Sequence, residues 1–154
     1  MKQFYLQQIF STIFYLSNKI QTEGDKLVRD ITVRQWMTLL TILHLPEGKA
    51  NYNQIADMMG YSKQNAKKLV TVLERKGFVT IGKSDSDRRA VCIQVTESCR
   101  NILRNYYNRG NVYLNELFKD FDDDEAETLW KLLKKLTAYE GSAWHGYEEK
   151  ISLD

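Results

Sequence analysis

Two short apolar patterns on either side of a tight turn, within residues 53–79, constrain the fold more than any other part of this sequence. Ile55 and Met59 repeat at helical spacing, and Gly60 is the residue type that most readily ends a helix in the left-handed conformation. Ser62 is a preferred cap for the helix that follows. The stretch therefore predicts a short helix, a turn of about four residues and a longer helix, which together form a helix-turn-helix.

The second helix of this pair has a polar face opposite its apolar one. Its apolar positions recur at helical spacing and are Ala66, Leu69, Val70 and Leu73. The opposite face carries amide, hydroxyl and cationic groups, which are those of Gln64, Lys67, Lys68, Thr71 and Arg75. Such groups can hydrogen-bond base edges and phosphates in a DNA groove. The alternative is an ordinary solvated amphipathic helix, and this stretch alone does not decide between the two.

Charge is distributed unevenly along the chain. The net charge is only +2, whereas residues 62–91 carry eight Lys and Arg against three Asp and Glu, a net charge of +5. A basic segment on a chain that is otherwise slightly acidic is typical of a nucleic-acid interface. Residues 116–130 contain seven acids and one lysine. Because phosphates repel such a segment, we expect it to point away from any bound DNA.

After Gly77 the sequence period changes from that of a helix to that of a strand. Residues 78–81 are strand formers, and residues 91–95 alternate in polarity, so the two segments predict a β-hairpin. The loop between them is polar and contains Lys83, Arg88 and Arg89. We expect a wing whose arginines suit a narrow minor groove, with Asp87 paired to Arg89. The alternative is a solvated hairpin with a weak surface ion pair.

Cap chemistry marks two of the helix starts. Thr32 with Gln35, and Asn51 with Gln54, have the spacing of a capping box. Pro46 ends the helix that begins near residue 32.

The N-terminal segment, residues 1–21, predicts a helix that is apolar on several sides. The polar residues 22–30, which include Gly24, predict a turn and a connection. We favour burial of the helix against a second copy of the chain over burial within the monomer, because it is terminal and rich in aromatic residues. The residues assigned to this interface, including four from the last helix, are Phe4, Leu6, Ile9, Phe10, Ile13, Leu129, Leu132, Leu133 and Leu136.

The C-terminal part of the chain predicts two further helices. Residues 97–120 have the pattern of a long helix with Gly110 inside it as a candidate bend, and the acids at 122–125 suit the start of the last helix. The tail from Gly141 has no clear period. We expect it to be a fraying helix or an arm over a partner subunit.

Composition excludes several classes of protein. No apolar run approaches the roughly 18 residues of a membrane span, and the N-terminus has no signal-peptide pattern, so we expect a single-domain cytoplasmic protein that does not enter a membrane. Two cysteines and two histidines make a disulfide framework or a metal site improbable, and we expect no cofactor. The sequence contains no phosphate-binding glycine loop and no nucleophile elbow, so we expect no enzymatic activity. Cys92 is expected to be exposed on its strand, and Cys92 and Cys99 are weak candidates for thiol switches.

Five segments have the order and spacing found in one known family, and they are Thr32–Trp36, Ile55–Ser62, Leu69–Val79, Asp87–Ala90 and Val95–Thr96. Residues 32–96 therefore resemble the winged helix-turn-helix of the MarR (multiple antibiotic resistance regulator) family. The flanking segments 1–21 and 97–154 lie where that family has its dimerisation helices. The implied fold over residues 1–154 is mainly α with a small β-hairpin wing.

The resemblance implies a homodimer that represses transcription by binding pseudo-palindromic double-stranded operator DNA. Recognition helices would enter successive major grooves, wings would reach minor grooves, and a ligand or an oxidant would relieve repression. The positions that this assigns to DNA contact are Ser62, Lys63, Gln64, Asn65, Lys67, Lys68 and Thr71 in the helix, with Lys83, Arg88 and Arg89 in the wing. The chain departs from the family at two places. Ser98 and Cys99 stand where many members have a glycine, and Gly82-Lys83 stands where an arginine is frequent. It also lacks the first-helix cysteine of peroxide-sensing members.

A small aromatic or phenolic effector would act in a cleft between the dimerisation helices and the DNA-binding unit. The residues that we assign to such a cleft are Phe14, Tyr15, Trp36 and His44. The alternative for these aromatic residues is ordinary core packing. The alternative for the whole chain is a winged-helix module that binds protein and not DNA, against which the basic segment argues.

Overall fold

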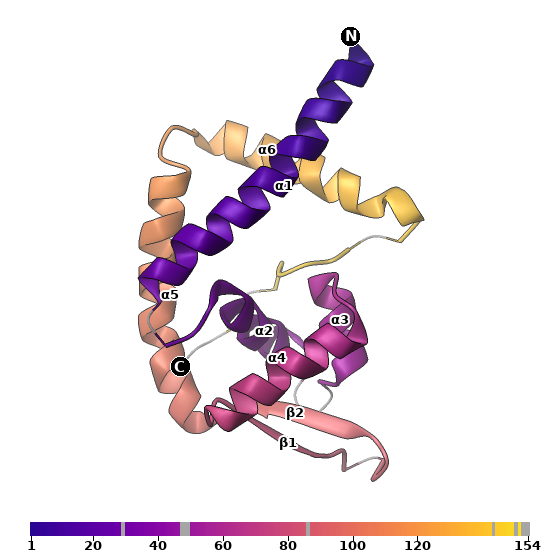
Figure 1. Ribbon diagram of the computed structural model, residues 1–154, viewed down its shortest axis with the longest axis vertical. Helices are drawn as coiled ribbons and strands as arrows, with labels where there is room; N and C mark the ends of the chain where they lie inside the picture. The colour runs from indigo at the N-terminus through magenta and orange to yellow at the C-terminus, as the bar shows by residue number, and fades with distance from the viewer. Residues whose placement is uncertain (29, 47–49, 86, 143, 150, 152–154) are drawn as a thin grey trace.

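The fold was analysed in a computed structural model that describes residues 1–154 except 29, 47–49, 86, 143, 150 and 152–154 (Figure 1). The helices and strands in chain order are α1 (Lys2–Leu27), α2 (Val33–His44), α3 (Tyr52–Met59), α4 (Lys63–Arg75), β1 (Val79–Lys83), β2 (Val91–Val95), α5 (Glu97–Leu117), α6 (Asp123–Thr137) and the 3-10 helix η1 (Ala138–Glu140). The expected fold class, mainly α with a hairpin wing, is confirmed.

The hydrophobic core lies between α2, α3, α4, the hairpin and the first part of α5. Leu39, Ile55 and Leu73 are fully buried at its centre, and Ile93 and Leu103 join them from β2 and α5. The apolar faces predicted for α3 and α4 turn toward this core, and full burial of a side chain such as Leu73 stabilises the fold by roughly 1.5–3 kcal/mol. The core therefore holds the helix-turn-helix and the wing as one unit.

The predicted helix caps are confirmed. The hydroxyl of Thr32 accepts from the backbone N–H of Gln35, whose side chain accepts from the backbone N–H of Thr32 in return, both at 3.2 Å. Asn51 and Gln54 form the same reciprocal pair at the start of α3. Gly60 ends α3 with φ of +66°, a left-handed conformation that glycine adopts at no steric cost.

The N-terminal helix is longer than predicted. We expected it to end near residue 21 and residues 22–30 to form a turn and a connection, but α1 continues to Leu27. Gly24 lies within the helix and is buried against the start of α2, where a Cβ atom would collide with Cγ2 of Val33. The other residues of this turn keep their polar groups toward solvent, so their hydrophilic character does not interrupt the helix.

The helices outside the core extend to the end of the molecule remote from the hairpin. Figure 1 shows α5 along one side, α1 running obliquely from beside α5 toward the remote end, and α6 lying across that end. Gly110 lies within α5, which continues through it without a break. The helix-turn-helix and the hairpin occupy the other end, and the first part of α5 packs in their core.

The C-terminal tail folds back onto its own chain. After η1, Trp144 donates a hydrogen bond from Nε1 to the carbonyl oxygen of Met58 in α3, at 2.9 Å. The hydroxyl of Tyr147 lies 2.9 Å from that of Thr41 in α2. The expectation that the tail frays as a helix or reaches over a partner subunit is therefore wrong for these residues.

Candidate nucleic-acid interface

Helix α4 presents a row of polar side chains to solvent because its apolar side is fixed in the core. Ala66, Val70 and Leu73 are buried, and the hydroxyl of Ser62 caps the helix by accepting from the backbone N–H of Asn65 at 3.2 Å. The side chains predicted to contact DNA that are exposed on this helix and its cap are Ser62, Lys63, Gln64, Asn65, Lys67 and Lys68. The first two turns of α4 thus offer hydroxyl, amide and ammonium groups on one surface.

Thr71 differs from the other predicted helix residues. Its side chain is only partly exposed, and its hydroxyl donates to the carbonyl oxygen of Lys67 one turn earlier, at 2.8 Å. Because a hydroxyl has a single proton, Thr71 is left with its oxygen lone pairs for a ligand. In this conformation it accepts hydrogen bonds from a base or a water and does not donate them.

The wing is an antiparallel hairpin in which Val79 pairs with Val95 and Lys83 with Val91. Lys83, Arg88 and Arg89 are exposed near its tip. The predicted ion pair between Asp87 and Arg89 does not form. The carboxylate of Asp87 instead accepts from the backbone N–H of Arg89, at 2.9 Å, which tightens the turn. The guanidinium group of Arg89 therefore remains available to a phosphate or a groove.

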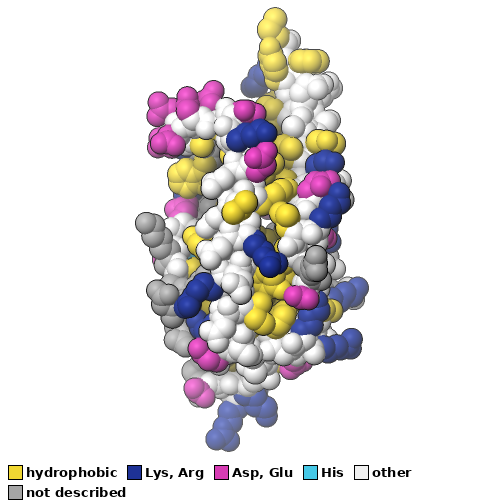
Figure 2. Space-filling model, turned by 90° about the vertical axis from the view of Figure 1, so that its left-hand side faces the viewer, with side chains coloured by type: hydrophobic (Ala, Val, Ile, Leu, Met, Phe, Trp, Pro, Cys, Tyr) yellow, Lys and Arg dark blue, Asp and Glu magenta, His cyan; other side chains and the backbone are white. Residues whose placement is uncertain are grey.

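The charged groups separate toward the two ends of the molecule. Figure 2 shows Asp and Glu side chains clustered at the upper end and Lys and Arg side chains projecting from the lower end. The upper cluster corresponds to the start of α6, where Asp123, Asp124 and Glu125 fill the first turn. The acidic segment thus lies at the end opposite the wing, as expected for a molecule that approaches phosphates with its basic end.

Lys76 belongs to the basic segment in sequence but has a structural role. Its ammonium group donates to the backbone carbonyl of Asp30 at 2.6 Å and to the side-chain oxygen of Gln35 at 3.0 Å. These bonds join the end of α4 to the start of α2. A count of basic residues along the sequence therefore includes one lysine that is engaged within the protein.

The four residues predicted to bind an effector do not converge. Phe14 and Tyr15 are exposed on α1, at 60% and 62% of their surface. His44 lies near the C-terminal tail, with its Nδ1 atom 2.7 Å from the carbonyl oxygen of Leu40 and its ring edge-on to Tyr147. Trp36 lines an apolar pocket.

That pocket has a volume of about 240 Å³ and lies between α1, α2 and α5. Trp36 packs edge-to-face against Tyr106 at its wall, with ring centroids 5.8 Å apart. Arg109 is the one charged residue among the side chains that line it. Reasoning from the sequence missed Arg109 and Tyr113 because they approach Trp36 only when α5 packs beside α1 and α2. Gly24, which also lines the pocket and has no room for a Cβ atom beside Val33, is a sequence signal of that close approach.

The winged helix-turn-helix residues match a known family. The model of the MarR family matches residues 29–90, which span the start of α2, the helix-turn-helix and most of the wing. Over these residues the chain matches the MarR family of transcriptional regulators. The match indicates that this part of the chain is a winged helix-turn-helix of the DNA-binding type.

Individual MarR-type relatives agree with this assignment. The chain is 30% identical to the uncharacterized HTH-type transcriptional regulator YfiV of Bacillus subtilis, over 70% of this chain and 66% of the relative, just under two thirds of its length. It is 23% identical to the transcriptional repressor MprA of Escherichia coli, over 88% of this chain and 79% of MprA. The structure of the MepR–DNA complex of Staphylococcus aureus is similar with a TM-score of 0.75 and 21% identity, over 84% of this chain and 96% of that one, which indicates a shared fold.

The two cysteines of the chain are buried. Cys92 was expected to be exposed on its strand, but only 8% of its surface is accessible. The backbone near Ala50 runs along the free edge of β2, where Ile93 donates to the Ala50 carbonyl at 2.8 Å, so this strand lies inside the domain. Burial raises the pKa of the Cys99 thiol to about 11, an effect that Arg100 only partly opposes. Such a thiol is protonated at neutral pH and reacts slowly.

The part of the chain that the structure describes contains neither a membrane-spanning helix nor a metal-ligand cluster. No helix there has the length and apolar character needed to cross a bilayer. No three His, Cys, Asp or Glu side chains in that part of the chain lie together as metal ligands would.

Proposed function

We propose that this protein is a transcriptional repressor that binds pseudo-palindromic operator DNA as a homodimer and is released by a small-molecule effector. The observation that carries the proposal is the pairing of the exposed polar face of α4 with the exposed basic tip of the wing at one end of the fold. A helix of this kind suits the major groove, and arginines on a hairpin suit the adjacent minor groove.

The side chains of α4 divide into base-reading and phosphate-binding types. The amides of Gln64 and Asn65 match the donor and acceptor pattern of adenine, and Lys67 or Lys68 matches guanine or a phosphate. Arg88 and Arg89 have the charge and reach for a minor groove. The α4 groups are exposed on a capped helix, and Arg88 and Arg89 are exposed on the turn between β1 and β2.

An unpartnered apolar surface supports the homodimer. Phe4 and Phe10 on α1 are exposed over 57% and 66% of their surface, and Leu132 on α6 over 60%. The other exposed residues that the sequence assigned to dimerisation are Leu6, Ile9, Ile13, Leu133 and Leu136. Leu129, which was assigned with them, is only partly exposed. A large exposed patch of this kind marks an interaction surface. We infer that the α1 and α6 helices of a second copy cover it.

The pocket beside Trp36 is the proposed effector site. It is apolar, with Arg109 as the charged group in its lining, so it suits a small aromatic acid or a phenol that places its oxygen near the guanidinium. Its walls come from α1, which belongs to the dimer region, and α2, which belongs to the DNA-binding unit. An occupant would therefore bias the spacing of the two reading helices and so the affinity for DNA.

Selection of DNA by the purified protein from random duplexes tests the proposal. The expected product is an inverted repeat whose half-sites lie about one helical turn apart, with binding that weakens steeply as salt is raised. Adding phenols and aromatic acids to the complex should then release the DNA. Failure to enrich any duplex, or binding that salt leaves unchanged, would favour a protein-interaction module instead. As a regulator of operator DNA, the protein is proposed to act in the cytoplasm.

A further inference from the structure

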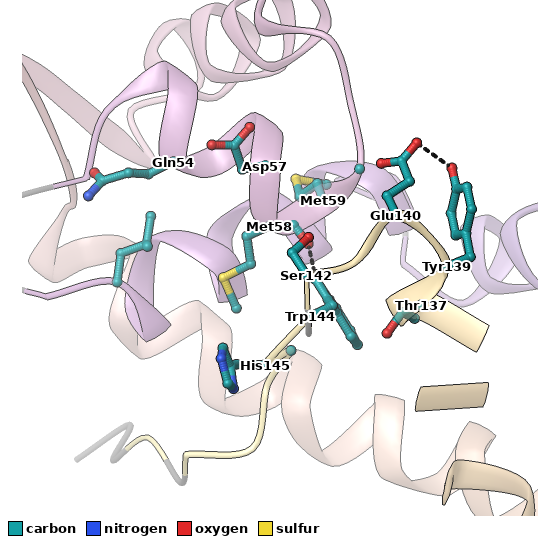
Figure 3. Close-up of a pocket in the computed structure, with 13 residues that line it drawn as sticks. Gln54, Asp57, Met58, Met59, Thr137, Tyr139, Glu140, Ser142, Trp144 and His145 are labelled. Atoms are coloured by element: carbon teal, nitrogen blue, oxygen red, sulfur yellow. Dashed lines mark hydrogen bonds between the residues drawn. The ribbon is translucent and has the colours of Figure 1, made fainter. Parts of the chain in front are cut away.

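The C-terminal tail forms a strap, defined here as residues 144–149, that joins the end of α6 to the helix-turn-helix. Figure 1 shows the chain leaving α6 and returning beside α2, and Figure 3 shows Trp144 directed at the C-terminal end of α3. The strap has no regular secondary structure. Its position therefore depends on the contacts that its side chains make.

The first contact completes the end of α3. The last carbonyl groups of a helix have no partner within it. The backbone N–H groups of Gly60 and Tyr61 return to Ala56 and Asp57, whereas the carbonyl of Met58 accepts from the indole N–H of Trp144. The strap thus supplies a cap to the helix that immediately precedes the turn of the helix-turn-helix.

The second contact fixes the strap to α2. Thr41 is fully buried, and its hydroxyl donates to the carbonyl of Met37 at 2.8 Å. Since that uses its only proton, the Thr41 oxygen accepts from Tyr147 in the 2.9 Å contact between the two hydroxyls. The ring of Tyr147 also packs edge-on to both His44 and Trp144, with centroids 5.1 Å and 5.9 Å apart.

The third contact ties the strap to α6 itself. Glu148 forms an ion pair with Lys134, which lies in the last turn of α6. The strap is therefore held at one end by α6 and along its length by α2 and α3.

The strap lies apart from the other link between the dimer region and the DNA-binding unit. That other link comes from α1 and α5, where Gln21 accepts from Arg34 at 2.6 Å and Tyr106 donates to Asp30 at 3.1 Å. These bonds hold the start of α2, whereas the strap holds the end of α2 and the end of α3. The DNA-binding unit is thus attached at both ends of α2.

We propose that Trp144 and Tyr147 are positioning residues for DNA reading, which couple α6 to the helix-turn-helix and so set the spacing of the two reading helices in the dimer. This inference rests on the proposed function. Two linked reading units bind a two-half-site operator tightly only if their spacing matches it, whereas a single half-site is insensitive to that spacing. The strap should therefore affect the full operator and leave an isolated half-site unaffected.

Trp144→Phe and Tyr147→Phe test the inference because each removes one hydrogen bond and keeps an aromatic ring at the position. Tyr139→Phe is the matched control, since the Tyr139 hydroxyl bonds only to the neighbouring Glu140 and the side chain is 79% exposed. Each strap variant should bind the selected operator about fivefold more weakly, which is the factor expected for one hydrogen bond. Its affinity for a single half-site, and the behaviour of the control, should match the wild-type protein. Equal losses on both duplexes, or no loss on either, would overturn the inference.

A measurement without DNA separates this inference from the proposed function. If the wild-type protein bound no duplex, the proposed function would fail, and the spacing would then be read between nitroxide labels attached at Lys67→Cys in the two subunits. A broader distance distribution in Trp144→Phe than in wild type supports the coupling. An unchanged distribution, or the absence of a dimer, rejects it.

Discussion

The ammonium group of Lys76 lies 2.6 Å from the backbone carbonyl oxygen of Asp30 and fastens the end of the reading helix to the segment before α2. Lys68, a little more than two turns earlier, is exposed with its charge toward solvent. Two lysines of one helix therefore have different roles, one within the protein and one toward a ligand.

Lys76→Ala should lower the stability of the protein and not its intrinsic ability to read DNA. It removes hydrogen bonds to Asp30 and Gln35, and we expect a loss of about 1 kcal/mol in the free energy of unfolding. Urea denaturation measures that loss. Unchanged stability, or weaker DNA binding by protein that is fully folded, would contradict the structural role.

Arg89→Ala should weaken DNA binding on all sequences alike. The Asp87 carboxylate bonds to the backbone of Arg89, so the substitution leaves the turn intact and removes only the guanidinium. We expect the slope of log affinity against log salt to fall by about one. Lys119→Ala, which removes a lysine paired with Glu116 at the opposite end of the molecule, is the control and should leave the slope unchanged. An equal slope in both variants would place the wing outside the interface.

Phe10→Glu should prevent dimerisation without unfolding the chain. Phe10 is 66% exposed on α1, so the monomer tolerates a charge there, whereas a buried interface does not. Sedimentation at micromolar concentration should give a dimer for wild type and a monomer for the variant. Gln94→Glu adds the same charge on an exposed strand position and should remain a dimer. A wild-type monomer, or a dimeric Phe10→Glu, would refute the assigned interface.

Cys99 should make the protein less stable in alkaline solution. Its pKa in the folded state is raised from 9.0 to about 11, so the folded protein binds the proton more tightly than the unfolded chain. The tighter binding of the proton contributes about 2–3 kcal/mol to the free energy of unfolding. This contribution is fully present below pH 9 and is lost as the pH rises toward 11. The difference in unfolding free energy between wild type and Cys99→Ala should therefore shrink between pH 8 and pH 10.5 (roughly the window that the two pKa values define). A difference that stays constant would disprove the shift.

Local signals in the sequence predicted the fold well. The capping residues Thr32, Asn51 and Ser62 and the C-terminal Gly60 act through bonds to neighbours within a few residues, so their spacing alone placed the ends of α2, α3 and α4. The change of period after Gly77 likewise placed the wing.

Features that depend on tertiary contacts were not predictable in the same way. We predicted a turn at Gly24 because its contact with Val33, which belongs to a different helix, leaves no local signal in the sequence. Cys92 read as exposed because nothing near it in sequence indicates that its strand lies inside the domain. The positions of Trp144 and Tyr147 could not be predicted from a local period because their partners, Met58 and Thr41, lie far away in the chain.

The most direct test of the account is the affinity of Lys68→Ala for the selected operator, measured by fluorescence anisotropy at several salt concentrations. Lys68 is exposed on the reading face and is expected to meet a guanine or a phosphate. The account predicts that binding weakens by about 1–3 kcal/mol if Lys68 reads a base, while the melting temperature and the dimer remain as in wild type. Wild-type affinity in Lys68→Ala at every salt concentration would contradict the assignment of α4 as the helix that reads DNA.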